Sequence, residues 1–182
     1  MDIQLNVSEK ESRQELLERY EFRTIHPEEG EQAAEIERIC FPPNEACSRT
    51  MMLERIDRAP DCFLVAVDKR TGRLAGFLNG LATDETMFRD EFFTDATLHQ
   101  IDGKAIMLLG LDVLPEHRRQ YLASELVRQY KRMQRECGRE LLILTCLDSK
   151  VEMYQKMGFQ DKGIADSSWG GEEWHEMSCV LI

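Results

Sequence analysis

Residues 109–124 of the chain read LGLDVLPEHRRQYLAS, an apolar run followed by an arginine-rich turn. The run from Ala105 to Val113 is typical of a strand buried on both faces, and a proline stops it two residues later. A long helix is then expected from about Tyr121 to Cys137. The first N–H groups of such a helix lack partners within it and carry partial positive charge, so the turn is a potential anion site.

The charge of this helix differs from that of the rest of the chain. Between His117 and Arg139 there are seven arginine and lysine residues and two glutamates, an excess of five positive charges. The whole chain has 34 acidic and 23 basic residues and a net charge of -11. The basic helix fits a phosphorylated ligand, but it also fits the solvated face of an ordinary surface helix. Periodicity and charge alone leave both interpretations open.

Length and composition limit the classes of protein that the sequence allows. With 182 residues, the chain is expected to form one main domain whose core needs no disulfide or metal. The acid excess argues against nucleic acid or an anionic membrane as a partner, because both attract basic surfaces. No apolar run approaches the ~20 residues of a membrane span, and no signal peptide is expected from the first residues. The six cysteines are scattered without metal-binding spacing, which indicates reduced thiols and a cytoplasmic protein.

The pattern of the remaining chain predicts an α/β domain of the mixed, α+β kind. A short N-terminal helix is expected behind the capping-box pair Ser8 and Glu11. Further helices are expected over residues 27–40, 48–59 and 151–157, and strands over residues 21–25, 62–67, 74–78, 141–147 and 174–181 and from Phe159 onward. Residues 83–103 show no clear pattern, and long connections are often functional.

Two motifs resemble those of the GNAT N-acetyltransferase superfamily. Val113-x-Pro115-x-x-Arg118-x-x-x-Leu122-Ala123-Ser124 is similar to its pyrophosphate-binding motif, and Tyr154-Gln-Lys-Met-Gly158-Phe159 resembles its Tyr-x-x-x-Gly-Phe signature. Three more segments resemble the arylalkylamine (serotonin) N-acetyltransferase subfamily: Glu35-Ile-Glu-Arg38 with Phe41, Cys146-x-Asp148-x-x-Val151-x-x-Tyr154, and Glu176-Met177-x-Cys179. The resemblance implies a helical extension over residues 1–19 and an acetyltransferase domain over residues 20–182. It also implies a central, mostly antiparallel mixed sheet that splays at its middle strands and is flanked by helices.

The resemblance further implies a binding site for acetyl-CoA and no metal. The backbone of Leu111, Asp112 and Val113 would pair with the pantetheine amides, almost as an added strand. The turn would present its amides to the pyrophosphate through Arg118, Arg119, Gln120, Tyr121, Leu122, Ala123 and Ser124. The thioester would then enter between residues 111–113 and the strand at residues 144–147.

Tyr154 is the one residue to which the resemblance gives a catalytic role. It would lie near the sulfur of CoA and donate a proton to the leaving thiolate. A thiol of pKa ~8.5 leaves more readily when a phenol of pKa ~10 bonds the developing charge. The alternative is a core aromatic residue whose hydroxyl is satisfied locally.

The sequence departs from the family pattern in two places. Tyr121 stands where the motif usually has Gly, so this side chain would point outward, pack on the nucleotide or weaken cofactor binding. Met107 and Leu109 replace two histidines that relay the substrate proton in the arylalkylamine enzymes. An alkyl ammonium of pKa ~10 is only ~0.1% neutral at pH 7, so another group must take that proton. A water chain ending on one of these side chains would do so: Asp112, Glu45, His99 or Glu173.

The expected reaction is acetyl transfer from acetyl-CoA to a small primary amine, an arylalkylamine for instance, in a monomer or homodimer. Direct attack in a ternary complex is favoured, because neither Cys146 nor Cys179 has an evident His partner. Acidic residues crowd residues 28–37 and 84–95, which border the acceptor side in this fold; they would attract a cationic amine or simply solvate the surface. Two alternatives remain, a protein N-terminus or lysine as the acceptor, and a CoA-binding module without catalytic activity.

Overall fold

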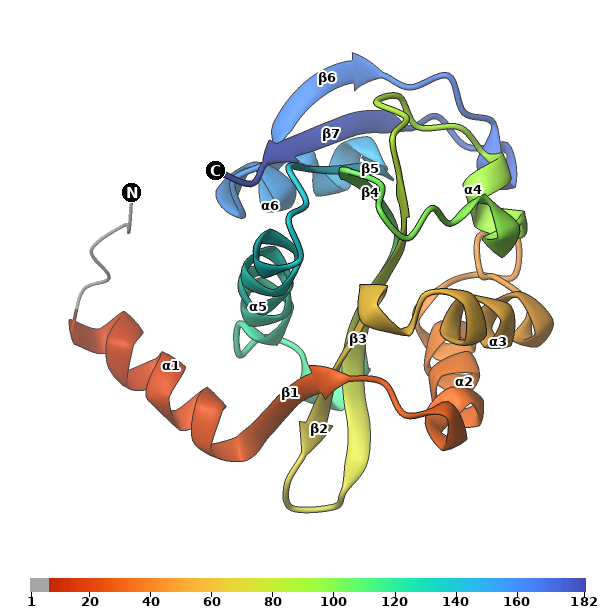
Figure 1. Ribbon diagram of the computed structural model, residues 1–182. Helices are drawn as coiled ribbons and strands as arrows, with labels where there is room; N and C mark the ends of the chain where they lie inside the picture. The colour runs from red at the N-terminus through yellow and green to blue at the C-terminus, as the bar shows by residue number, and fades with distance from the viewer. Residues whose placement is uncertain (1–6) are drawn as a thin grey trace.

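The computed structural model describes residues 7–182 and contains a seven-stranded sheet (Figure 1). Its strands are β1 (Tyr20–Thr24), β2 (Phe63–Asp68), β3 (Arg73–Thr83), β4 (Ala105–Val113), β5 (Leu141–Cys146), β6 (Gln160–Ile164) and β7 (His175–Val180). They lie in the order β1-β2-β3-β4-β5-β7-β6, and neighbouring strands are antiparallel except for β4 and β5. The expected mixed, mostly antiparallel sheet is therefore confirmed.

Helices cover both faces of this sheet. They are α1 (Val7–Arg19), α2 (Gly30–Cys40), α3 (Arg49–Arg58), the short α4 (Glu91–Thr94), α5 (Leu122–Glu136) and α6 (Val151–Lys156). In Figure 1, α2 and α3 lie on one side of β3 and α5 lies on the other. Ser48 caps α3 as expected, with its hydroxyl accepting the N–H of Met51 at 3.2 Å.

Alternation along the strands divides the core into two clusters. Phe63 and Val65 of β2 pack with Ile36 and Met52 of the α2–α3 pair, whereas Leu64 and Ala66 pack with the residues under α5. Because successive side chains of a strand point to opposite faces, each strand contributes to both clusters. The antiparallel partner of Phe77 is Asp112, which is thus placed on the α2 side of β4.

The sheet opens between its two central parallel strands. Pairing joins Ala105–Met107 of β4 to Leu141–Ile143 of β5 and ends there. The rest of β4 runs on to Val113 with its β5-facing edge unpaired by that strand. This is the splay that the sequence predicts, and it leaves backbone groups free for a ligand.

Three expectations about the elements need correction. Val7, the first described residue, is already helical, so Ser8 lies inside α1 and does not cap it, and Tyr20 belongs to β1. Strand β3 continues to Thr83, five residues beyond the expected end. Residues 84–104 are not featureless, because they contain α4 and a 3₁₀ turn at Ala96–Leu98 and bury Phe88 and Phe92. Over the described part of the chain, no helix combines the length and the apolar character needed to cross a membrane.

Candidate active site

A cavity of about 540 Å³ lies where β4 and β5 separate. On the α5 side it is lined by Leu111 and Val113 of β4 and by the first residues of α5. The wall formed by β5 and α6 contains Leu144, Cys146 and Tyr154. The cavity therefore runs along the open edge of β4 from the arginine-rich turn toward α2.

The turn before α5 adopts the backbone geometry of an anion site despite its side chains. Arg119 and Tyr121 both have positive φ, 61° and 65°, which is the left-handed conformation that favours glycine. Tyr121 is the N-cap of α5, and its side chain is 75% exposed. The amides of Leu122, Ala123 and Ser124 follow in the first helical turn, where no intrahelical acceptor exists for them. Tyr121 therefore keeps the conformation expected of Gly and points outward.

A buried hydrogen-bonded group holds this turn against the sheet. The Tyr20 hydroxyl of β1 lies 2.6 Å from His117 Nδ1, and Gln120 Nε2 donates to the same hydroxyl at 3.1 Å. The hydroxyl of Tyr20 thus joins both Gln120 and His117 and ties β1 to the turn. Sequence analysis did not identify Tyr20, because its partners are about a hundred positions away.

Arg118 lies across the open edge of β4. Its Nε donates to the carbonyl oxygen of Val113 at 2.8 Å, and the thiol of Cys40 donates to the same oxygen at 3.4 Å. That oxygen is one of the groups expected to meet the pantetheine chain. A ligand N–H that bonds this oxygen must therefore displace at least one of these contacts, because a carbonyl oxygen has two lone pairs.

The cavity brings together most of the residues predicted for the acetyl-CoA site. The lining includes Leu111, Val113, Arg118, Arg119, Tyr121, Leu122, Ala123, Ser124 and Tyr154. Asp112 and Gln120 are absent from it. Asp112 directs its side chain toward α2 and its carbonyl oxygen toward Gly76 of β3, and Gln120 is occupied with Tyr20.

Most of the positive charge on α5 has a structural task. Arg128 and Arg132 pair with Glu125 and Glu136 on the same helix. Lys131 bonds the carbonyl of Met157, at the end of α6. Arg139 is buried, where it binds the carbonyls of residues 101 and 103. Of the cations between positions 117 and 139, Arg118 and Arg119 line the cavity.

Tyr154 lies on the wall opposite the turn. Its ring packs edge-on against Phe159 at 5.7 Å, so the Tyr-x-x-x-Gly-Phe signature forms a local aromatic pair. Burial raises the pKa of Tyr154 well above its usual value, and nearby Cys146 and Asp112 raise it further. Tyr154 is therefore a protonated phenol throughout the neutral range, the form that a proton donor requires.

The cysteine on the same wall is unsuited to nucleophilic attack. Burial raises the pKa of Cys146 to about 11, and the carboxylates of Asp161 and Asp148 add to this. A thiol of this kind is protonated at neutral pH. The cavity thus offers no activated thiolate at Cys146 for an acyl-enzyme.

The other end of the cavity has aromatic walls from distant segments. Phe41, Phe93, Trp169 and Trp174 line it. Trp169 stacks on Phe93 with ring centres 4.7 Å apart, and its Nε1 donates to the carbonyl of Glu45 at 2.9 Å. Asn44 donates to the carbonyl of Gly170 at 3.0 Å. These contacts join the loop after α2 to the loop between β6 and β7, which in Figure 1 lies beside α4.

Of the four expected proton acceptors, the cavity lining includes Glu45. Burial, and then the charge of Glu172, raises the pKa of Glu45. Glu173 is exposed outside the lining, and Asp112 lies behind the wall. Glu37, which the sequence analysis placed only among the acids of residues 28–37, is a buried residue of α2 that lines the cavity and lies against Asp112.

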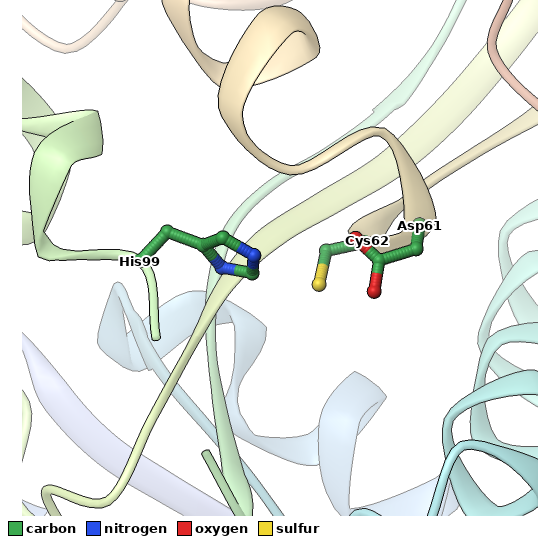
Figure 2. A group of neighbouring side chains, drawn as sticks. All are labelled: Asp61, Cys62 and His99. Atoms are coloured by element: carbon green, nitrogen blue, oxygen red, sulfur yellow. The ribbon is translucent and has the colours of Figure 1, made fainter. Parts of the chain in front are cut away.

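His99 is remote from the cavity and faces Asp61 and Cys62, as Figure 2 shows. Ligand atoms of these three residues lie within 4.8 Å of one another. His99 Nδ1 accepts the N–H of Ala82 at 3.1 Å, so the neutral ring carries its proton on Nε2 and has no lone pair there for a metal. Asp61 is paired with Arg139, and burial raises the pKa of Cys62 to about 12. These groups form a structural cluster that is a poor metal site.

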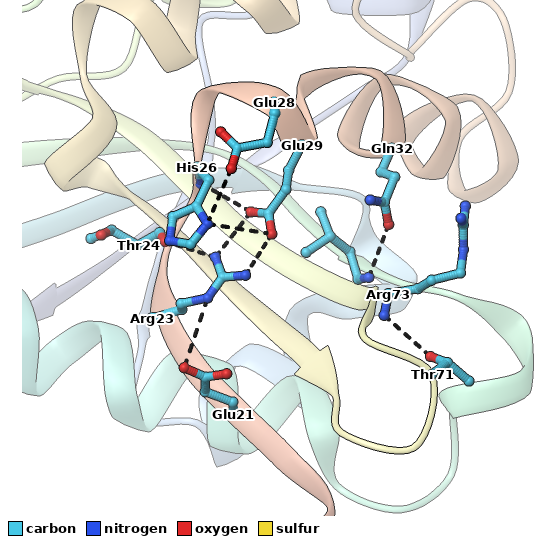
Figure 3. Close-up of polar contacts among 10 residues, drawn as sticks. Glu21, Arg23, Thr24, His26, Glu28, Glu29, Gln32, Thr71 and Arg73 are labelled. Atoms are coloured by element: carbon cyan, nitrogen blue, oxygen red, sulfur yellow. Dashed lines mark hydrogen bonds and ion pairs between the residues drawn. The ribbon is translucent and has the colours of Figure 1, made fainter.

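The acidic residues near α2 and α4 are mostly neutralised by arginines. Figure 3 shows Arg23 between Glu21 and Glu29, with the N–H of His26 also bonded to Glu29. The same holds for three further pairs: Glu31 with Arg49, Glu35 with Arg38, and Glu85 with Arg89. Solvation and local pairing therefore account for most of these acids, as the simpler interpretation predicts.

The sheet split between β4 and β5, the free amides of the turn and the phenol on α6 are the features that the sequence predicts for an acyl-CoA-binding enzyme. The model of the acetyltransferase (GNAT) family matches residues 30–159, more than half of the chain. The protein therefore belongs to this family, and it is an acetyl-CoA-dependent N-acetyltransferase that needs acetyl-CoA as its donor.

Several solved structures share the fold at low sequence identity. The GNAT-like decarboxylase GphF, in complex with isobutyryl-CoA, superposes with a TM-score of 0.74 at 19% identity, over 89% of this chain and 100% of that one. YncA from Salmonella typhimurium, with its cofactor acetyl-CoA, gives a TM-score of 0.62 at 14% identity, over 90% and 94%. The ribosomal-protein-S18-alanine N-acetyltransferase from Escherichia coli gives 0.65 at 15% identity, over 89% and 94%. Because these neighbours differ in their chemistry, they define the fold and leave the acceptor open.

Proposed function

We propose that this protein transfers the acetyl group of acetyl-CoA to the primary amine of a small arylalkylamine. One observation carries the choice of acceptor: contacts join three distant segments at the aromatic end of the cavity and so restrict the space there. Trp169 bonds Glu45 and stacks on Phe93, and Asn44 bonds Gly170. A polypeptide needs an open groove at this end, whereas an aromatic amine fits between aromatic walls.

The reaction follows a direct path in which both substrates are bound together. The pantetheine chain lies along the free edge of Leu111 and Val113, and the pyrophosphate meets the amides of the turn at 118–124. The neutral amine attacks the thioester carbon, the carbon–sulfur bond breaks, and Tyr154 donates its phenolic proton to the departing thiolate. The raised pKa of Cys146 supports this path over an acyl-enzyme.

The alternatives make different predictions in a single assay. We would follow thiol release from acetyl-CoA with a panel of 2-phenylethylamine, an aliphatic amine, a peptide with a free N-terminus and a lysine peptide. Fastest release with 2-phenylethylamine, with the acetylated product identified by mass, supports the proposal. Preference for either peptide would assign a protein acceptor, and acetyl-CoA binding without release would assign a non-catalytic module.

The same proposal includes a cytoplasmic location. All six cysteines are free, and Cys47, Cys62 and Cys146 are held as protonated thiols by burial. This agrees with a reducing compartment.

A further inference from the structure

The acceptor side of the cavity contains two buried carboxyl groups in contact. Glu37 of α2 is 3% exposed and lines the cavity, and Asp112 of β4 is fully buried behind it. Asp112 lies on the α2 face of β4 because it shares the orientation of Phe77, its partner on β3. A side chain at Gly110 would intrude on the pair, since its Cβ would lie 3.0 Å from Asp112 Oδ1 and 3.5 Å from Glu37 Oε2.

The hydrogen bonds around Glu37 and Asp112 indicate that the two carboxyl groups share one proton and carry one negative charge between them. Glu37 Oε1 accepts the N–H of Cys47 at 3.1 Å. Glu37 Oε2 and both oxygens of Asp112 are buried and have no donor from other groups among the described residues. Two ionised carboxylates in contact repel each other, and neither could satisfy the other. One proton held between the two groups removes both difficulties.

Asp112 is the member that holds this proton, because the N–H of Cys47 bonds Glu37 and favours its ionised form, whereas neither oxygen of Asp112 has such a donor among the described residues. Burial raises the pKa of Asp112 well above its usual value, and the charge and hydrogen bond of Glu37 raise it further. A protonated Asp112 donates to Glu37 Oε2, so Glu37 remains an anion on the cavity wall. Asn79 and Arg55, both buried, form a polar chain beside it, with Arg55 donating to Asn79 and Asn79 to the carbonyl of Gly110.

Few other ionisable groups face this pair. Cys40 and Cys47 contact it from α2 and the following loop, Arg55 approaches from α3 and Tyr154 from α6. Burial raises the pKa of both Cys40 and Cys47, so each is a neutral thiol at pH 7. Arg118 lies beside Cys40 and remains a cation. Glu37 is therefore the anion at this position of the wall.

Resting on the proposed function, we infer that Glu37 is the base that takes the proton of the substrate ammonium, with Asp112 as its positioning residue. The ammonium gives one proton to Glu37, and the freed lone pair attacks the thioester carbon. A second proton leaves the nitrogen as the amide forms and replaces the one that Tyr154 gives to the thiolate. Glu37 then returns its proton to solvent, so each turnover yields the amide, CoA as its thiol and one proton. Glu37 thus takes the place of the two proton-relaying histidines that Met107 and Leu109 replace in this sequence.

The test compares Glu37→Gln with Glu35→Gln, an exposed position on the same helix that pairs with Arg38. With 2-phenylethylamine at pH 7, Glu37→Gln should lower kcat by about 100- to 10,000-fold, while the affinity for acetyl-CoA stays within about twofold of wild type. Glu35→Gln should leave both unchanged. The loss at Glu37→Gln should shrink with 2,2-difluoro-2-phenylethylamine, since its fluorines lower the pKa of the ammonium and less proton transfer to the protein is needed.

Asp112 has a separate readout in the pH profile. Asp112→Leu removes the donor that we infer for Glu37 Oε2, and no other donor reaches this atom from residues 7–182, so the buried carboxylate is less stable and the acid limb of kcat should move to higher pH. Asp112→Asn keeps a donor and should leave the limb near its wild-type position. Both variants are compared at saturating acetyl-CoA, with binding of acetyl-CoA as the check on folding.

The possible failures are distinguishable. Unchanged turnover and pH profile in Glu37→Gln, with active wild type, would overturn the role of Glu37 and leave the acetyltransferase proposal intact. An unshifted acid limb in Asp112→Leu would overturn the role of Asp112. Wild-type protein that binds acetyl-CoA but acetylates no amine of the panel would overturn the proposed function, and the base with it.

Discussion

The two ends of the cavity are built in different ways; under the proposed function one binds the acetyl donor and the other the amine, and we call them the donor half and the acceptor half. The donor half comes mainly from β4, the turn after it and the start of α5, so one run of sequence supplies its wall. The acceptor half combines Glu37 of α2, Phe93 of α4 and Trp169 before β7. A wall made from one segment imposes a local pattern that can be recognised as a motif. A wall made from distant segments exists only after folding.

The largest effect is expected at Tyr154, which lies where the two halves meet. Tyr154→Phe removes the donated proton while keeping the ring against Phe159, so kcat should fall by about 100- to 10,000-fold. The dissociation constant for acetyl-CoA should stay within about twofold, because the phenol acts on the leaving group and not on the bound nucleotide. Steady-state kinetics and acetyl-CoA titration measure the two quantities.

Tyr130→Phe is the matched control for Tyr154→Phe. The Tyr130 hydroxyl donates to the carbonyl of Cys62 in the core, so its loss should cost about 1 kcal/mol of stability with full turnover per folded molecule.

The raised pKa of Tyr154 predicts the pH dependence of the wild-type enzyme, because this proton donor stays protonated to higher pH than a free phenol. Activity should therefore show no basic limb from Tyr154 below about pH 10. Full turnover in Tyr154→Phe would remove this residue from the mechanism.

A second, smaller effect should separate the halves from the donor side. Arg119→Glu places a negative charge at the expected pyrophosphate position, where a lost charge-assisted bond is worth about 1.5 to 3 kcal/mol. Acetyl-CoA should bind about 10- to 100-fold more weakly, whereas a pantetheine fragment without pyrophosphate should bind as before. Isothermal titration with both ligands measures the difference.

Arg132→Glu is the control for Arg119→Glu, because Arg132 lies on the exposed face of α5, where it pairs with Glu136 one turn further along the helix. Equal weakening of both ligands by Arg119→Glu would show that the turn does not hold phosphate. The KM for the amine at saturating acetyl-CoA should not move in either variant, since both positions belong to the donor half or to the outer face of α5.

The converse perturbation acts on the acceptor side. Trp169→Ala removes the ring stacked on Phe93 and the bond to the Glu45 carbonyl, each worth about 1 kcal/mol. The KM for 2-phenylethylamine should rise by about tenfold, with acetyl-CoA affinity unchanged. Trp169→Phe keeps the stacking on Phe93 and loses only the hydrogen bond, so its KM for 2-phenylethylamine should lie between those of the wild type and Trp169→Ala. A loss of acetyl-CoA affinity in Trp169→Ala would show that the halves are not separate.

The order and type of most elements and the sheet split were predictable, and most residues proposed for the donor site lie together, because their signals are short-range. A strand, a proline, a turn and a long helix follow one another over residues 105–137, and nine of the eleven predicted binding residues line the cavity. The two exceptions are Asp112 and Gln120, whose side chains are used to hold Glu37 and Tyr20. Their orientation depends on which face of the sheet each residue occupies, and on partners far away in sequence.

The acceptor site could not be predicted for the same reason. Glu37 is one of several glutamates in a helix whose other acids pair with arginines, and nothing local distinguishes it. It becomes distinct only when Asp112 approaches it, from a strand seventy-five positions away in the sequence. The part of residues 84–104 in the cavity wall could likewise not be predicted, because Phe93 is placed there by stacking on Trp169, a residue far away in sequence.

The smallest effect concerns Tyr121, where the donor half departs from its own motif. The residue holds a left-handed φ of 65° with its side chain 75% exposed, so Tyr121→Gly gives up little buried area and removes about 1 kcal/mol of backbone strain. Without a Cβ, the helix amides can approach the pyrophosphate more closely, and acetyl-CoA should bind about threefold more tightly. Tyr121→Ala separates Cβ from ring: it keeps the Cβ and should bind acetyl-CoA as wild type does. Equal affinity in the Ala and Gly variants would mean that the Cβ is no obstacle. Weaker binding in both variants would instead show that the ring of Tyr121 packs on the nucleotide. The side chain would then contribute to acetyl-CoA binding instead of weakening it.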